Sequence, residues 1–146
     1  MAQFGRPSTD TVNEGYTDQL GGATSIFQKI DESVADDADY IQSALAPTSD
    51  VYVTKLTTLE DPNSSTGHTV RVRRSKNSAG GASISLTVQL RQGYVSEGTP
   101  GTLIATVMNT TIDENWTTTT YNLSGAEADA ITDYTDLYLR FVSNQT

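Results

Sequence analysis

The sequence predicts an all-β fold, an antiparallel jelly-roll-like β-sandwich of seven or eight strands with one short helix and an extended N-terminal arm. Three observations predict it. Short runs of apolar residues, several of them alternating with polar ones, recur along the chain, which is typical of half-buried strands. Clusters of Gly, Pro, Asn, Asp and Ser separate these runs at roughly 8 to 15 residues, too closely for βαβ units. Only one segment has marked helical propensity.

The first 25 residues contain scattered apolar side chains without a helical or a strand period. Such a segment cannot bury itself, so we expect an arm that is held by the surface of its own domain or by a neighbouring subunit. The predicted organisation is therefore an arm at 1–25 and a β-sandwich domain at 26–146. The residues expected to anchor the arm to a partner are Phe4, Arg6, Val12, Tyr16 and Leu20.

The predicted strands follow from residue 26 onward. They lie at 26–30, 40–45, 51–56, 69–74, 83–91, 103–108, 116–123 and 137–142. The clearest is 83–91, which places four aliphatic residues on one face and polar residues on the other. Residues 124–131 break this series, because Ser124 and Glu127 have the spacing of a capping box and three alanines follow the serine. We expect one or two helical turns there, before the last strand.

Composition excludes several classes of function. The chain of 146 residues has 18 acidic residues against 9 Lys and Arg, a formal charge of −9, so nucleic acid is not an expected partner. It has no cysteine, and His68 is its single histidine, which excludes thiolate chemistry and sites with two imidazoles. No signal peptide or membrane span is recognisable, so we expect synthesis in the cytoplasm and no membrane partner. No cofactor is expected.

The sequence does not predict an enzyme. Paired carboxylates for glycoside hydrolysis need one acid in an apolar setting, whereas the acids here stand in polar, turn-like contexts. A Ser-His-Asp set would have to use His68, but no G-x-S-x-G motif is present. A structural histidine, bonded to a backbone carbonyl, is the preferred interpretation of His68.

Two charged segments are candidate binding sites. The acids Asp36, Asp37 and Asp39 form the strongest part of an acidic turn that could hold Ca²⁺, although its spacing is not that of an EF-hand and a solvated turn is the preferred alternative. The other segment is basic and contains Arg71, Arg73 and Arg74. It is a candidate docking face for an acidic neighbour or for the acidic turn of another copy. Equally, it could be an edge strand that charge protects against aggregation.

Aromatic side chains offer a third candidate. Trp116, Tyr94 and Tyr134 could form a platform that stacks on sugar rings, and ordinary core packing is the commoner alternative.

Three strings of residues resemble a known group of proteins. They are KIDESVADDADYIQSALAP at 29–47, DPNSSTGHTVRVRRSKNSAGGASISLTVQLRQG at 61–93 and YNLSGAEADAITDYTDLYLRF at 121–141. Together they resemble small virion proteins of tailed bacteriophages that infect aquatic bacteria, from residue 26 to the end of the chain. The resemblance implies a structural virion component with a jelly-roll body, present in many copies.

The function expected from these observations is that of a capsid decoration or cement protein. The sandwich would bind the outer shell in the virion, after assembly in the host cytoplasm, and the arm would clamp neighbouring subunits. The expected partners are the major capsid protein or other virion subunits, with further copies of the chain in a dimer or trimer. The alternative is a tail or tail-fibre module that binds host surface glycans.

Overall fold

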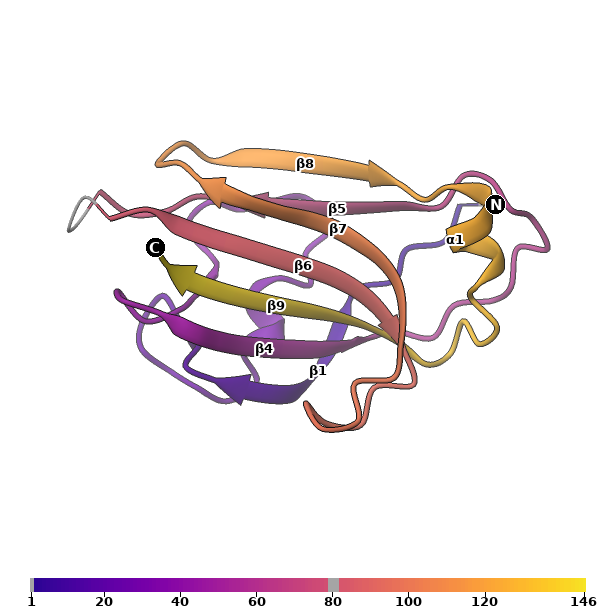
Figure 1. Ribbon diagram of the computed structural model, residues 1–146, viewed down its shortest axis with the longest axis horizontal. Coiled ribbons are helices and arrows are strands. Elements are labelled where there is room, and N and C mark those ends of the chain that lie inside the picture. The colour runs from indigo at the N-terminus through magenta and orange to yellow at the C-terminus, as the bar shows by residue number, and fades with distance from the viewer. Residues whose placement is uncertain (1, 79–81) are drawn as a thin grey trace.

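The computed structural model describes residues 2–78 and 82–146, and its largest element is a five-stranded antiparallel sheet (Figure 1). In spatial order this sheet contains β1 (Pro7–Glu14), β4 (Thr48–Leu56), β9 (Leu137–Gln145), β6 (Ile84–Gln92) and β7 (Thr102–Ile112). A second, smaller layer pairs β5 (Thr69–Arg74) with β8 (Thr117–Asn122). The predicted all-β, antiparallel, sandwich-like fold is confirmed.

The chain passes repeatedly between the two layers. It runs from β4 to β5 and back to β6, forms the β6–β7 hairpin, then runs to β8 and back to β9. These crossings are jelly-roll-like, with a second layer of only two strands. A further pair of two-residue strands, β2 (Thr17–Asp18) and β3 (Ile41–Gln42), lies outside both layers.

The main core lies between the layers. Strand β6 shows how alternation builds it, because Leu86, Val88 and Leu90 are buried between partly exposed polar neighbours. In the second layer Val72 is buried while Arg71 and Arg73 are exposed, as the alternation at 69–74 predicts. The sandwich therefore has one apolar interior, with both layers contributing to it.

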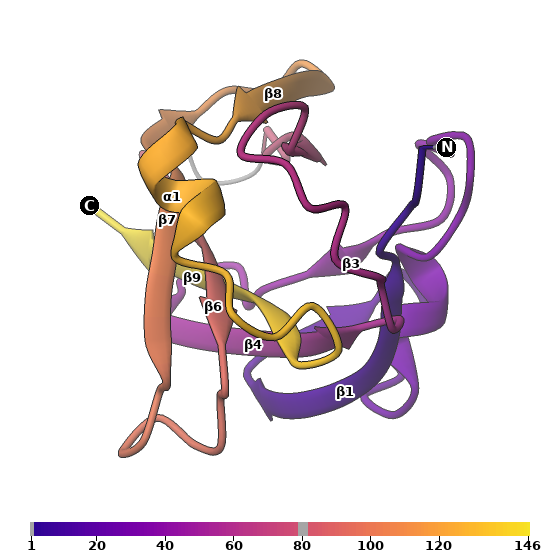
Figure 2. The same cartoon turned by 90° about the vertical axis from the view of Figure 1, so that its right-hand side faces the viewer.

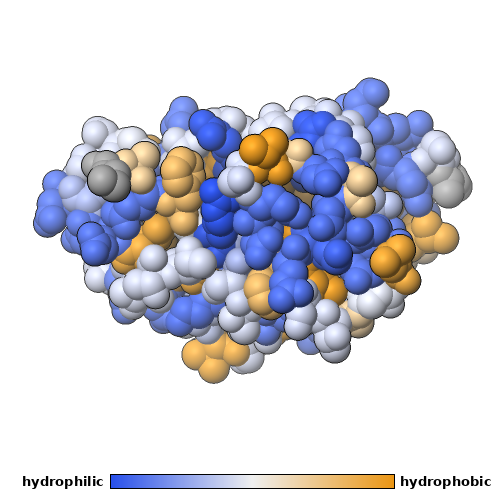
Figure 3. Space-filling view, turned by 180° about the vertical axis from the view of Figure 1, so that it is seen from behind, coloured by the Kyte–Doolittle hydropathy of each residue, from blue (hydrophilic) through white to orange (hydrophobic). Residues whose placement is uncertain are grey.

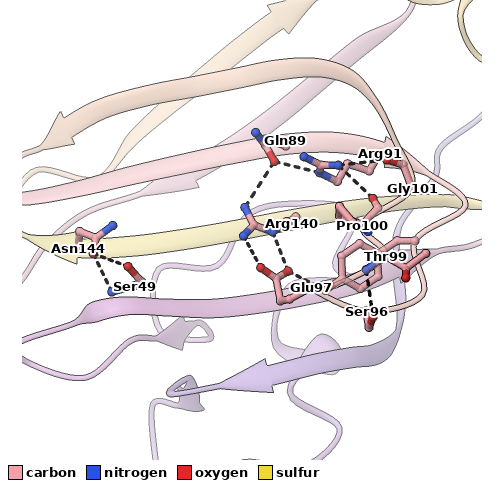
Figure 4. A network of polar contacts seen from close by, with 11 residues as sticks. Ser49, Gln89, Arg91, Ser96, Glu97, Thr99, Pro100, Gly101, Arg140 and Asn144 are labelled. Atoms are coloured by element: carbon pink, nitrogen blue, oxygen red, sulfur yellow. Dashed lines mark hydrogen bonds and ion pairs between the residues drawn. The ribbon is translucent and has the colours of Figure 1, made fainter.

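The hairpin loop at 93–101 covers part of the outer face of the large sheet. Tyr94 in this loop packs on Tyr138, and Glu97 accepts hydrogen bonds from Arg140 at 2.8 and 2.5 Å (Figure 4). Gly101 allows the tight return to β7, because it has φ +65° and a Cβ there would lie 2.2 Å from the carbonyl of Gln92. The loop thus closes a second apolar cluster against this face.

The expected boundary after residue 25 is wrong, since β1 is a full strand of the large sheet and pairs with β4. The register shifts between Pro7 and Thr9 and again between Asp10 and Val12. Two such irregularities interrupt the two-residue alternation, which is why the sequence shows no strand period here. The N-terminal segment is therefore part of the domain.

Other predicted elements are confirmed or corrected locally. Helix α1 (Gly125–Asp129) begins with the predicted capping box, in which Ser124 and Glu127 bond each other's backbone. Residues 26–30 do not form a strand but the 3-10 helix η1 (Ile26–Lys29), and within 40–45 only β3 pairs. The other six predicted strands are present. In the described part of the chain, no helix has the length and apolar character needed to cross a membrane.

Candidate functional site

An open cleft of about 1470 Å³ lies between the two layers. It exists because two strands of the second layer face five strands of the first, so part of the large sheet has no strand opposite it (Figure 2). Ligand pockets usually measure about 300–1,000 Å³, and this cleft is larger. Its inner walls are aliphatic and aromatic side chains from both layers, among them Val70, Val72, Ile84, Leu86, Leu139 and Phe141.

Residues 2–7 and most of the segment 30–45 also line the cleft, and because many of them are exposed they lie at its mouth. Two large apolar side chains at this mouth are exposed to solvent, Phe4 at 66% and Leu45 at 76%. Leu20 and Val34, in the same N-terminal part of the chain, are also exposed. On the face opposite that of Figure 1, apolar side chains form separate patches among polar ones (Figure 3). Sequence reasoning missed Val34 and Leu45, although both are isolated aliphatic residues in polar segments.

The five predicted anchors of the arm have different environments. Phe4 and Leu20 are exposed and available to a partner. Tyr16 is buried and its hydroxyl bonds the hydroxyl of Ser143, while Val12 packs in the cluster on the outer face of the sheet. Arg6 bonds the backbone carbonyl of Glu32 and lies 5.6 Å from the Phe4 ring centroid. The prediction that Val12 and Tyr16 anchor the chain to another subunit is therefore wrong, because both side chains pack within their own domain.

The predicted docking charges are partly used within the chain. Arg73 makes a bidentate ion pair with Asp37 at 2.5 and 2.6 Å, and this pair lowers the pKa of Asp37. Arg74 donates to the backbone carbonyl of Thr117 at 2.9 Å. Arg71 is exposed, and its side chain makes no bond to any residue that the structure describes. The acidic residue that pairs with this basic strand thus comes from the same chain and not from another copy. Of the three arginines, Arg71 keeps a side chain without a partner among the described residues.

The three carboxylates proposed as calcium ligands do not converge. Asp36 accepts the amide of Ala38 at 2.8 Å, Asp37 pairs with Arg73, and Asp39 pairs with Lys29 at 3.2 Å. Within residues 2–78 and 82–146, no three His, Asp or Glu side chains are grouped as metal ligands. The acidic turn is therefore held by local bonds and ion pairs, and the calcium hypothesis is corrected.

The three aromatic residues proposed to stack on sugars do not form a platform. Tyr94 is 3% exposed and packs on Tyr138, and Tyr134 is 9% exposed in the main core. Trp116 is partly exposed, with its ring centroid 5.7 Å from that of Tyr40 and 5.7 Å from the guanidinium carbon of Arg73. Core packing thus accounts for two of the three residues.

Three polar atoms in the lining of the cleft are buried without a hydrogen-bond partner among the described residues. They are Glu32 Oε1, His68 Nδ1 and Arg74 Nε. The other ring nitrogen of His68 bonds the Tyr134 hydroxyl at 2.7 Å, rather than the backbone carbonyl expected from the sequence. Burial raises the pKa of Glu32, and nearby acids raise it further. The lining of the cleft is therefore largely apolar, and it also contains three buried polar atoms that no described residue bonds.

No protein-family model, curated protein or solved structure matches the chain. The assignment of a function therefore depends on the surface and the cleft just described, together with the resemblance in the sequence.

Proposed function

We propose that this chain is a structural virion protein of a tailed bacteriophage, of the capsid decoration or cement kind. One observation carries the proposal: among the residues that the structure describes, four of the six exposed large apolar side chains lie before residue 46, namely Phe4, Leu20, Val34 and Leu45. Of these, Phe4 and Leu45 line the same cleft, and exposed apolar surface at such a site marks a contact that a partner covers. The resemblance to small phage virion proteins supports the same conclusion.

The proposed mode of attachment differs from a free arm. Strand β1 fixes the N-terminal segment to the large sheet, so the attachment surface is the wrapped segment 2–45 rather than a flexible tail. Docking would remove Phe4 and Leu45 from water at the mouth of the cleft and so stabilise contacts with the shell. The proposal includes two or three copies around a symmetry axis of the shell.

Binding to phage particles tests this proposal. The labelled protein is incubated with emptied heads and, separately, with isolated tails of the phage that encodes it. We expect binding to heads, and the double variant Phe4→Ser, Leu45→Ser should bind at least about tenfold more weakly, because two apolar side chains no longer become buried. The matched control is Val95→Ser, Leu103→Ser, which changes two exposed apolar residues outside the segment 2–45.

Two outcomes would contradict the proposal. The first is equal loss of head binding in the control variant, which would mean that segment 2–45 is not the contact. The second is binding to tails or host glycans instead of heads. The glycan hypothesis has less support than the decoration hypothesis, because Tyr94 and Tyr134 are buried.

A further inference from the structure

Strand β5 has a neighbour on one edge only. Its partner in the second layer is β8, and no other strand of the described chain pairs with it. The amide of Leu123 donates to the carbonyl of His68 at 3.0 Å, one position before the ladder begins. Along an antiparallel ladder, residue pairs that exchange backbone hydrogen bonds alternate with pairs that do not. His68 and Leu123 belong to the hydrogen-bonded kind, and so do the pairs two and four residues further along β5. The backbone N–H and C=O groups of Val70 and Val72 therefore point toward β8.

The backbone groups at the alternate positions of β5 point away from β8. The backbone groups of Thr69, Arg71 and Arg73 face the free edge, and among residues 2–78 and 82–146 they have no backbone partner beyond the strand pairing. This edge faces the cleft, because every residue of β5 lines the cleft while β8 contributes only Thr118. An unpaired edge of this kind is the template to which an extended peptide adds as a further strand.

A strand added here would complete the second layer. Its alternate side chains would enter the cleft beside Val70 and Val72, where the walls are apolar. The remaining side chains would point outward, beside Arg71 and Arg73. Since Arg73 already pairs with Asp37, the free charge available to an added strand is that of Arg71.

We propose that the free edge of β5 binds, by strand addition, an extended segment of another protein in which apolar residues alternate with Asp or Glu. Charge complementarity with Arg71 selects the acidic residues, and the cleft selects the apolar ones. Pairing of two β5 edges from two copies would bring arginines close to arginines, which is unfavourable. The proposal rests on the geometry of β5 and goes beyond the virion assignment, because a peptide can bind here whether or not phage heads do.

Synthetic peptides test the proposal on the intact protein. The probe is a short labelled peptide that alternates valine with glutamate, and its binding is measured by fluorescence anisotropy. Two matched peptides serve as controls, one with lysine in place of glutamate and one with alternate backbone nitrogens methylated. We expect the acidic peptide to bind and both controls to bind at least about tenfold more weakly, because one reverses the charge and the other removes strand hydrogen bonds.

A pair of protein variants tests the role of Arg71. Arg71→Gln should weaken binding of the acidic peptide about two- to fivefold, the range of an exposed ion pair. Lys55→Gln makes the same change of charge on the five-stranded sheet, outside the cleft lining, and should leave binding unchanged. Hydrogen exchange locates the contact, because the amides of Thr69, Arg71 and Arg73 should become protected only when the peptide is bound.

Several results would overturn the proposal. They are no binding of the acidic peptide, equal binding of the methylated or lysine peptide, or an equal effect of the two protein variants. Protection of the same three amides on raising the protein concentration alone would show that a second copy takes the edge. Loss of head binding with intact peptide binding would instead count against the proposed function and leave this inference standing.

Discussion

The hydroxyl of Tyr52 donates a hydrogen bond of 2.7 Å to Asp10 Oδ1. Tyr52 is fully buried in β4, and Asp10 lies in β1, so the bond ties the N-terminal strand to the middle of the domain. The same carboxylate accepts the amides of Ile26 and Phe27 at 2.9 Å each. Burial and the neighbouring Asp10 both raise the pKa of Tyr52, which keeps its hydroxyl protonated as a donor. One aspartate thus holds β1, β4 and η1 together.

Replacing Asp10 by alanine should therefore destabilise the protein by about 2–3 kcal/mol, since a buried hydroxyl and two amides lose their acceptor. Urea unfolding measures the change in the free energy of unfolding. The matched control, Glu14→Ala, removes an exposed carboxylate from the same strand and should change stability by less than about 0.5 kcal/mol. Equal effects of the two variants would contradict the role assigned to Asp10.

Truncation distinguishes an integral strand from a free arm. A chain that starts at Ser25 loses β1 and the Asp10 bonds, so we expect no cooperative unfolding transition by circular dichroism. A chain that lacks residues 1–5 keeps β1 and should unfold within about 1 kcal/mol of the full chain. A stable, cooperative fold of the chain from Ser25 onward would show that residues 1–24 are an appendage.

The cleft should make the domain more tolerant of a larger side chain in its lining than in its packed core. Val72 lines the cleft, whereas Val88 is fully buried in the main core away from it. The same change, valine to leucine, should therefore cost less than about 0.5 kcal/mol at Val72, where there is space, and about 1–3 kcal/mol at Val88, where the added methylene must displace its neighbours. Urea unfolding of both variants checks this. Equal costs at the two positions would mean that the cleft is closed in solution.

The ion pair on the outer face predicts a pH dependence. The Arg140 guanidinium lowers the pKa of Glu97 below its ordinary value of 4.5. Because the folded-state pKa is the lower one, the pair stabilises the fold above the ordinary pKa, and this contribution is lost as the pH falls through the folded-state value. Glu97→Gln should thus cost about 1 kcal/mol at pH 7 and nearly nothing well below the folded-state pKa. A cost independent of pH, in urea titrations, would contradict this.

The fold class was predictable because its signals are local. The alternation in β5, β6 and β9 and the capping box before α1 each lie within a few neighbouring residues. Strand β1 was not predictable, since two irregularities of register interrupt its alternation and its stability depends on β4, some 40 residues away in sequence. Long-range pairing of this kind leaves no periodic signal in the strand itself.

The candidate site was only partly predictable. Phe4 and Leu20 were recognised as unburied apolar residues, and the arginines of β5 were recognised as a basic row. The sequence could not indicate that Asp37 of the same chain would take Arg73, or that the second layer would stop at two strands. Both depend on how distant segments meet.

Hydrogen exchange of the protein, free and bound to emptied phage heads, directly tests the proposed attachment through segment 2–45. Binding should slow exchange in 2–7 and 30–45, around Phe4 and Leu45, and should leave the hairpin loop at 93–101 unchanged. Protection confined to the loop, or no protection in the segment 2–45, would contradict it.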